Sequence, residues 1–176
     1  MLPRSKVIPL GRTRVIPTRL AGNDFYPLNS YGNNLVTNGN MELDSNWVNF
    51  STPAINERSS TYKVNGAYSR HFTEDAAFEG IQSDNFTVVA GKWYKVEGWF
   101  YRTDVNAGSV ILSFRYPAAT VIGAPAYSGN KNVWIYLSGI YQSYISIATA
   151  FVAVYCSANL CDLYCDDISV RQILGL

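Results

Sequence analysis

The chain has 176 residues, of which 48% are hydrophobic and 15% charged, so it can bury a core and is not disordered throughout. Aromatic residues and Gly are frequent, with 13 Tyr and 4 Trp, which favours strands and turns over helices. The net charge of +1 is unevenly distributed: residues 1–34 carry five basic side chains against one acidic side chain, hence +4, and the remainder carries −3.

The first segment contains a tandem repeat: "RSKVIP" at 4–9 recurs as "RTRVIP" at 12–17. Four of the seven prolines also lie in residues 1–34, and proline excludes helix at its own position and favours extended backbone before it. The pattern predicts an extended basic arm over residues 1–34 and a head over residues 35–176. The arm residues expected to make contacts are Arg4, Lys6, Val7, Ile8, Arg12, Arg14, Val15, Ile16 and Arg19.

Such an arm is expected to bind another subunit. Ordering the fourteen residues of the repeat costs roughly 14–28 kcal/mol of backbone entropy. Burial of its four aliphatic side chains returns at most about 6–12 kcal/mol. Pairing with a sheet edge or with an acidic surface would supply the rest. Nucleic acid is the competing partner, but a charge of +4 is modest for that role. The arm also lacks the apolar core of a secretory signal.

Beyond residue 34, short runs rich in β-branched and aromatic residues alternate with turn residues, and no segment shows a helical period. After an initial strand at 34–36, the predicted strands are 62–64, 68–73, 86–89, 93–102, 109–116, 133–138, 146–155 and 163–173. Short strands at this spacing are typical of an all-β sandwich or barrel.

Two of these strands alternate strictly between apolar and polar positions. In the strand 93–102, the core face is predicted to hold Tyr94, Val96, Gly98 and Phe100, and the opposite face Trp93, Lys95, Glu97, Trp99 and Tyr101. In the strand 109–116, the core face is predicted to hold Val110, Leu112, Phe114 and Tyr116.

The region 132–161 has no charged residue and is long enough to span a bilayer. Ser, Gly and Gln recur through it, however, and β-branched and aromatic residues dominate. We therefore interpret it as two buried strands with a turn near Ser143, and we expect no membrane partner.

Five motifs occur in a fixed order: "NLVTNGNME" at 34–42, "GAYSRHF" at 66–72, "GIQSDNFTVVAGKWYKVEGWFYR" at 80–102, "VWIYLSGIY" at 133–141 and "LYCDDISV" at 163–170. In this order they resemble the jelly-roll carbohydrate-binding modules found beside cellulases and xylanases. Those modules open with Asn-Gly-x-x-Glu, contain an Ala-Gly-Lys-x-Tyr turn and close on an Asp-Asp-aliphatic strand. The resemblance covers 34–173, about four-fifths of the chain, and implies an all-β jelly-roll sandwich.

The resemblance implies glycan binding on a sheet face lined by aromatic residues. The outward row Lys95, Glu97, Trp99 and Tyr101 suits such a face, because a sugar ring can stack on the aromatic side chains while the charged ones bond its hydroxyls. A subunit interface is the alternative use of the same row.

The resemblance also implies a structural calcium ion near the chain ends. Asp166 is expected to point inward, since it shares parity with Ile168 and Val170, and either to ligate calcium or to cap backbone amides. Glu42 is the second candidate ligand.

The three cysteines leave two alternatives open. A hairpin around "SANL" would place Cys156 opposite Cys161 and Cys165 opposite Val152, so a disulfide and free thiols are both compatible with the sequence. Their spacing is not that of a zinc knuckle, and the single histidine, His71, is far along the chain.

No catalytic motif is present: Gly-x-Ser-x-Gly, His-Glu-x-x-His and a phosphate loop are all missing, so we expect neither an enzyme nor a required cofactor. We predict a non-enzymatic structural protein of a bacteriophage virion, a capsid decoration or cement protein whose arm binds the major capsid protein or neighbouring copies. A host surface glycan is a further candidate partner. The alternatives are a free glycan-binding module or adhesin, and a tail or fibre component.

Overall fold

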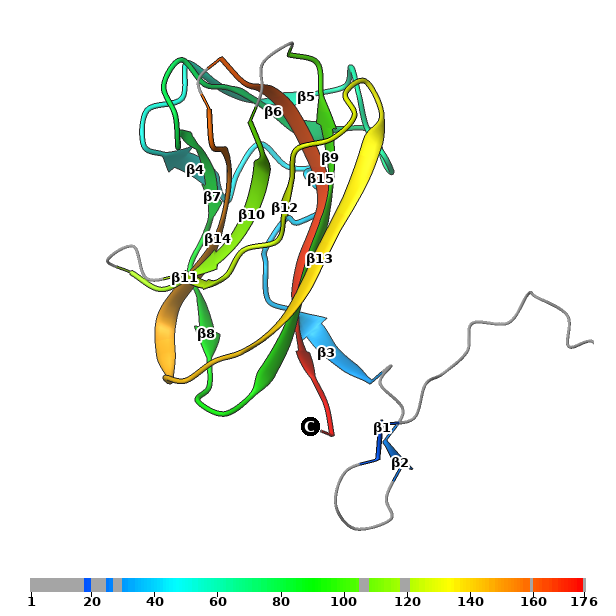
Figure 1. Cartoon of the computed structure of the whole chain (residues 1–176), viewed down its shortest axis with the longest axis vertical. Helices are drawn as coiled ribbons and strands as arrows, with labels where there is room; N and C mark the ends of the chain where they lie inside the picture. Colours follow the sequence, from blue (N-terminus) through cyan, green and yellow to red (C-terminus); the bar gives the residue numbers. More distant parts are fainter. Residues whose placement is uncertain are drawn as a thin grey trace, which may run out of the picture.

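The computed structural model describes residues 18–19, 25–26, 30–104, 108–117, 121–158 and 160–175. The described part of the chain forms strands, and most of them belong to two antiparallel sheets packed face to face (Figure 1). The expected all-β jelly-roll sandwich is therefore confirmed.

The first sheet carries the candidate site and has the strand order β13-β9-β15-β6-β5, with β3 paired to β15. Its strands are β3 (Tyr31–Asn34), β5 (Ile55–Ser59), β6 (Ser69–Thr73), β9 (Trp93–Arg102), β13 (Trp134–Gln142) and β15 (Asp162–Ile173).

The second sheet has the order β11-β10-β14-β7-β4, with β12 paired to β10 and β8 paired to β14. Its strands are β4 (Trp47–Phe50), β7 (Gly80–Ser83), β8 (Phe86–Val88), β10 (Val110–Arg115), β11 (Val121–Gly123), β12 (Ala126–Tyr127) and β14 (Ile147–Cys156). A separate pair is formed by β1 (Thr18–Arg19) and β2 (Phe25–Tyr26).

The core lies between the two sheets, and the alternation predicted for two strands is confirmed. Along β9, Tyr94, Val96 and Phe100 are at most 1% exposed, and along β10 Val110, Leu112 and Phe114 are fully buried. Burying a large apolar side chain stabilises a fold by about 1.5–3 kcal/mol. The two strands belong to opposite sheets, so these inward rows hold the sandwich together.

The hairpin considered for the cysteines does not form, because β14 and β15 lie in different sheets, although Cys156 and Cys161 do form a disulfide, one of the two alternatives left open. β14 pairs with β10 and β7, whereas β15 pairs with β9 and β6. Cys165 therefore lies opposite Phe100 and Arg70 rather than opposite Val152. Sequence parity describes only neighbours within one sheet, and here the chain crosses from one sheet to the other between Cys156 and Asp162.

The turn predicted near Ser143 is confirmed, since β13 ends at Gln142 and β14 begins at Ile147. Ser143 is fully buried and exchanges backbone hydrogen bonds with the Ala90-Gly91-Lys92 turn: Gly91 N–H donates to Ser143 O at 2.7 Å, and Ser143 N–H donates to Lys92 O at 2.9 Å. Gly91 has φ +77°, a conformation that costs glycine little. Among the described residues, no helix is long and apolar enough to cross a membrane.

The arm residues with predicted contacts lie outside the described residues, except Arg19, whose backbone forms part of β1. The segment Tyr31–Asn34, which the sequence analysis placed in the arm, is strand β3 of the first sheet. The strand predicted at 62–64 is a loop instead.

Candidate functional site

The outward face of the first sheet is a grid of side chains set by the strand register. Residues directly opposite each other in an antiparallel pair point to the same side. Four rows therefore run across the sheet: His71-Tyr164-Tyr101-Trp134, Asp166-Trp99-Tyr136, Ser169-Glu97-Ser138 and Arg171-Lys95-Ile140. The predicted row Lys95, Glu97, Trp99 and Tyr101 supplies one residue to each.

Tyr101 belongs to a packed aromatic cluster rather than to an open surface. The ring of Tyr62 stacks on Tyr101 with centroids 4.3 Å apart, and the ring of Trp134 packs against Tyr101 with centroids 5.5 Å apart. Next along the row, His71 stacks on Tyr164 at 4.3 Å. Because Tyr62 covers it, Tyr101 offers no free ring face for a sugar.

The same histidine is held between two carboxylates. His71 Nδ1 lies 3.1 Å from Glu57 Oε1, and His71 Nε2 lies 2.8 Å from Asp162 Oδ1. His71, on β6, therefore links β5 to β15 through its two ring nitrogens.

Glu97 is the polar hub of the face. It forms an ion pair with Lys95, accepts a hydrogen bond from the Tyr136 hydroxyl, and accepts another from Ser169 Oγ at 2.9 Å. Partial burial raises the pKa of Glu97, but the hydrogen bonds from Lys95, Tyr136 and Ser169 outweigh it, so the net pKa lies below its usual value. Glu97 is thus a fixed, ionised acceptor.

A β-bulge in β15 shapes the centre of the face. The register between β15 and β9 shifts between Asp166 and Ser169, and Asp167 takes a φ of +49°. The side-chain amide of Asn34 links β3 to the bulge: its Nδ2 donates to Ile168 O at 3.2 Å, and its Oδ1 accepts from Val170 N–H at 3.0 Å. Ile168 N–H donates to Gly39 O at 2.8 Å. Irregular backbone of this kind re-aims side chains next to binding sites.

A depression of about 390 Å³ lies over the bulge, within the size range of ligand sites. Trp99 and Tyr136 form its aromatic part, with ring centroids 5.2 Å apart and Tyr136 43% exposed. Its lining comprises Asn34, Gly39, Asn40, Glu97, Trp99, Tyr136, Asp167, Ile168, Ser169 and Arg171. Two of the four predicted row residues, Glu97 and Trp99, thus line the depression. Lys95 is not among the lining residues, but it forms an ion pair with Glu97.

The parity predicted for Asp166 is wrong, although its side chain is fully buried. The bulge shifts the alternation, so Asp166 lies opposite Trp99 on the outward face and is covered by the loop at 62–68. Its carboxylate accepts hydrogen bonds from the backbone amides of Val64 at 2.9 Å, Asn65 at 3.2 Å and Asp167 at 2.8 Å. Burial raises the pKa of Asp166 to about 6, and these three amide donors oppose that rise.

Glu42 caps the other end of the same loop. Its Oε1 accepts hydrogen bonds from Ala67 N–H at 2.8 Å and Tyr68 N–H at 3.2 Å. Calcium takes six to eight oxygen ligands, whereas both carboxylate oxygens of Asp166 and Oε1 of Glu42 accept hydrogen bonds from backbone N–H groups. In this arrangement the two acids suit amide capping, and the calcium site stays a prediction.

Comparison with known proteins gives matches at the level of structure. No protein-family model and no curated protein sequence matches the chain. A xylan-binding family 22 carbohydrate-binding module of Paenibacillus barcinonensis Xyn10C superposes with a TM-score of 0.61 at 13% identity, covering 78% of this chain and 94% of the module. A family 16 carbohydrate-binding module gives a TM-score of 0.57 at 17% identity, with coverage of 78% and 99%.

The fold is that of a jelly-roll carbohydrate-binding module. A third structure, the family 22 and catalytic modules of Clostridium thermocellum xylanase 10B complexed with xylohexaose, agrees with a TM-score of 0.65 at 15% identity. The superposed region is 83% of this chain but only 29% of that longer protein. At such identities the likeness shows the fold, and the resemblance read from the sequence motifs is confirmed at that level.

Four other residues that line the depression were not predicted from the sequence. Asn34, Gly39, Tyr136 and Arg171 come from β3, the loop after it, β13 and β15, which only the folded topology brings together. Tyr136 had a usable signal, because alternation in the strand beginning at 134 places it outward with Ser138.

Proposed function

We propose that the chain is a non-catalytic glycan-binding module whose site is the depression over the β15 bulge. The observation that carries the proposal is the pairing of an aromatic platform, Trp99 and Tyr136, with the fixed acceptor Glu97 in one concavity. Sugars present apolar ring faces and hydroxyl edges, and this combination meets both.

The polar lining supports recognition of hydroxyl groups. Ser169 and Asn40 line the depression beside Glu97. Arg171 is exposed and, within the described part of the chain, forms no ion pair, so its guanidinium is available to a ligand. The likeness to xylan-binding modules makes a β-linked plant polysaccharide such as xylan the first ligand to test.

The electrostatics of Glu97 support binding rather than hydrolysis. A glycosidase needs a carboxylic acid with a raised pKa to protonate the leaving oxygen. Glu97 has a lowered pKa and is engaged by three side-chain donors, so it is unsuited to donate a proton.

Affinity electrophoresis on a panel of polysaccharides, xylan included, tests the proposal. Trp99→Ala and Tyr136→Ala are expected to weaken retention roughly five- to 150-fold, if a sugar ring stacks about as strongly as a nucleobase does on an aromatic side chain, about 1–3 kcal/mol. Trp93→Ala is the matched control, since Trp93 is a half-buried residue on the same face of β9 outside the depression. Loss of retention in all three variants, or in none, would contradict this assignment of the site.

A second role concerns the repeated basic arm. We propose from its octad repeat and its charge of +4 that the arm anchors the chain in a larger assembly, with a bacteriophage particle as the candidate setting. A chain lacking residues 1–29 should fold, because β3 and the rest of the sandwich remain, but should not bind particles. Full occupancy of particles by the truncated chain would refute the anchor.

A further inference from the structure

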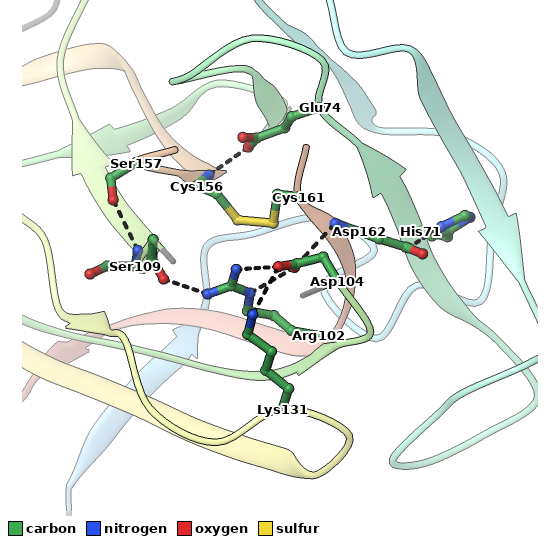
Figure 2. The surroundings of a disulfide bond; sticks show 11 residues. His71, Glu74, Arg102, Asp104, Ser109, Lys131, Cys156, Ser157, Cys161 and Asp162 are labelled. Carbon is green, nitrogen blue, oxygen red and sulfur yellow. Dashed lines mark hydrogen bonds and ion pairs between the residues drawn. A yellow bond between two sulfur atoms is a disulfide. The ribbon is translucent and has the colours of Figure 1, made fainter. Parts of the chain in front are cut away.

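A second cluster of reactive side chains lies at the end of the sandwich where the chain crosses between sheets. Cys156 and Cys161 form a disulfide there, and Glu74 points at it from the residue after β6 (Figure 2). The two sulfur atoms and a carboxylate oxygen all lie within 4.8 Å of one another. This is the one such group of His, Cys, Asp and Glu among the residues that the structure describes.

Glu74 is built into this cluster and has an unused ligand atom. The side chain is only 3% exposed; its Oε1 accepts a hydrogen bond from Cys156 N–H at 2.5 Å, while its Oε2 is buried with no hydrogen-bond partner among the described residues. A buried carboxylate oxygen without a partner is costly and calls for an explanation.

Backbone hydrogen bonds hold the two cysteines in place alongside the disulfide. Cys156 ends β14 and lies opposite Val110, and Glu74 N–H donates to Cys161 O at 2.9 Å. The next residue, Asp162, pairs with Thr73 in the neighbouring strand. Backbone hydrogen bonds on every side therefore keep the two sulfur atoms and Glu74 together after reduction.

We propose that, when the Cys156–Cys161 disulfide is reduced, the two thiolates and the Glu74 carboxylate bind one zinc ion. A Cα–Cα distance of 6.3 Å suits the proposal, because two sulfur atoms on tetrahedral zinc at about 2.3 Å stand about 3.8 Å apart. Thiolate and carboxylate are both zinc ligands, and water completes the tetrahedron. The metal then closes the same loop between β14 and β15 that the disulfide closes.

The chemistry balances in two steps. Two molecules of a thiol reductant convert the protein disulfide into two thiols and become a disulfide themselves. Zinc then displaces one proton from each thiol and, where the Glu74 carboxyl group is protonated, that proton as well, so that Glu74 coordinates as the carboxylate. Two thiolates, one carboxylate and Zn²⁺ carry a net charge of −1. Arg102, Asp104 and Lys131 form a neighbouring ion-pair group of net charge +1, with Arg102 Nη2 2.6 Å and Lys131 Nζ 3.4 Å from Asp104 Oδ1 (Figure 2).

The sequence alone argued against a zinc knuckle, because Cys156 and Cys161 are five residues apart and the single histidine, His71, is far along the chain. The third ligand, Glu74, lies 82 residues before Cys156 and reaches it only through the fold. Zinc binding would therefore replace one cross-link by another as the surroundings change from oxidising to reducing.

Metal titration of the full chain tests the proposal. The chain reduced with a phosphine is expected to take up a single Zn²⁺ in competition with a chromophoric chelator, and the oxidised chain none at this site. With Co²⁺ as a probe, the reduced chain should show thiolate-to-metal charge-transfer absorption in the near ultraviolet. Glu74→Gln is expected to weaken zinc binding by at least about 10–100-fold, the effect of losing even an outer-shell partner.

Two variants separate the site from other thiols. Cys165→Ala is the matched control, because Cys165 is a buried cysteine outside the cluster, and its zinc uptake should equal that of the unmodified chain. Cys156→Ser combined with Cys161→Ser should abolish uptake, and circular dichroism will show whether this variant is folded. Equal zinc binding by the oxidised and reduced chain, or no charge-transfer band with Co²⁺ in the reduced chain, would overturn the proposal whatever the variants do.

Discussion

Replacing Glu74 by Gln is expected to flatten the pH dependence of stability while the disulfide is intact. Burial raises the pKa of Glu74 from 4.5 to about 8; the hydrogen bond from Cys156 N–H opposes the rise, and the nearby Glu79 adds to it. Between these two pH values the folded chain holds a proton that the unfolded chain has released. The stabilisation by Glu74 is therefore complete below pH 4.5 and is lost as the pH rises towards 8.

The size of the effect follows from the interval between the two pKa values. Each pH unit corresponds to about 1.4 kcal/mol, so the interval from 4.5 to about 8 corresponds to at most about 5 kcal/mol. Gln has no charge to lose, and its amide oxygen can still accept the hydrogen bond from Cys156 N–H. Substitution therefore removes the slope rather than the local geometry.

Urea denaturation of the oxidised chain between pH 4.5 and 8.5, with a metal chelator present, measures this slope. The free energy of unfolding of the unmodified chain, minus that of Glu74→Gln, should fall by up to about 1.4 kcal/mol per pH unit. Asp84→Asn serves as the control, because Asp84 is an exposed carboxylate that accepts one hydrogen bond from Asn46. A difference that stays constant across this pH range would refute the reasoning.

The other predictions concern the depression and the loop beside it. Asp166→Ala should lower the melting temperature equally with calcium and with chelator, because three backbone amides lose their acceptor. A difference between the two conditions would instead indicate that Asp166 binds calcium. An unchanged melting temperature in both conditions would contradict any structural role of Asp166. Gly39→Ala should destabilise the fold by about 1–3 kcal/mol, since a Cβ there would lie 2.0 Å from Ile168 O. Gly91→Ala is the comparison: a Cβ there would meet no atom within 4 Å, so the variant should lose only the ~1 kcal/mol that its positive φ costs. Equal losses of the two variants in urea denaturation would argue against this. Glu97→Gln should weaken glycan retention with little change in melting temperature, because the Lys95 pair is partly exposed; unchanged retention would remove Glu97 from the site.

Alternation within a single strand was sufficient to predict the core rows and the outward row. The strand at 93–102 shows why: ten residues without a bulge alternate strictly between half-buried and buried. The closing strand behaves differently, because the bulge after Asp166 inserts one residue and so moves the residues before it to the opposite face. No single-sequence pattern marks that bulge, since it is held by Asn34 and Gly39 from the opposite end of the chain.

The depression and the cysteine cluster are likewise built by residues from distant parts of the chain, so the sequence pattern did not predict them. Tyr136 reaches Glu97 from the neighbouring strand, and Arg171 reaches the same concavity from the far end of the chain. Such contacts depend on which strands become neighbours, and short-range periodicity carries no information about that. The cysteine pairing illustrates the same point, because a hairpin and a crossover between sheets both bring Cys156 near Cys161.

The pairing of β3 with β15 determines how the sandwich would respond to tension. Tyr31 lies opposite Ile173 and Asn34 opposite Arg171, so the first and last strands of the sandwich leave it at the same end (Figure 1). A force that pulls these two ends apart would break the hydrogen bonds of the pair one after another, beginning at Ile173, rather than all at once. Peeling of β15 would then stop at Cys161, because the covalent bond to Cys156 passes the load to the opposite sheet. β15 is the central strand of the first sheet and pairs with β9 and β6, so a chain tethered at both ends of the sandwich would release β3 first, and further load would have to break the hydrogen bonds on both sides of β15.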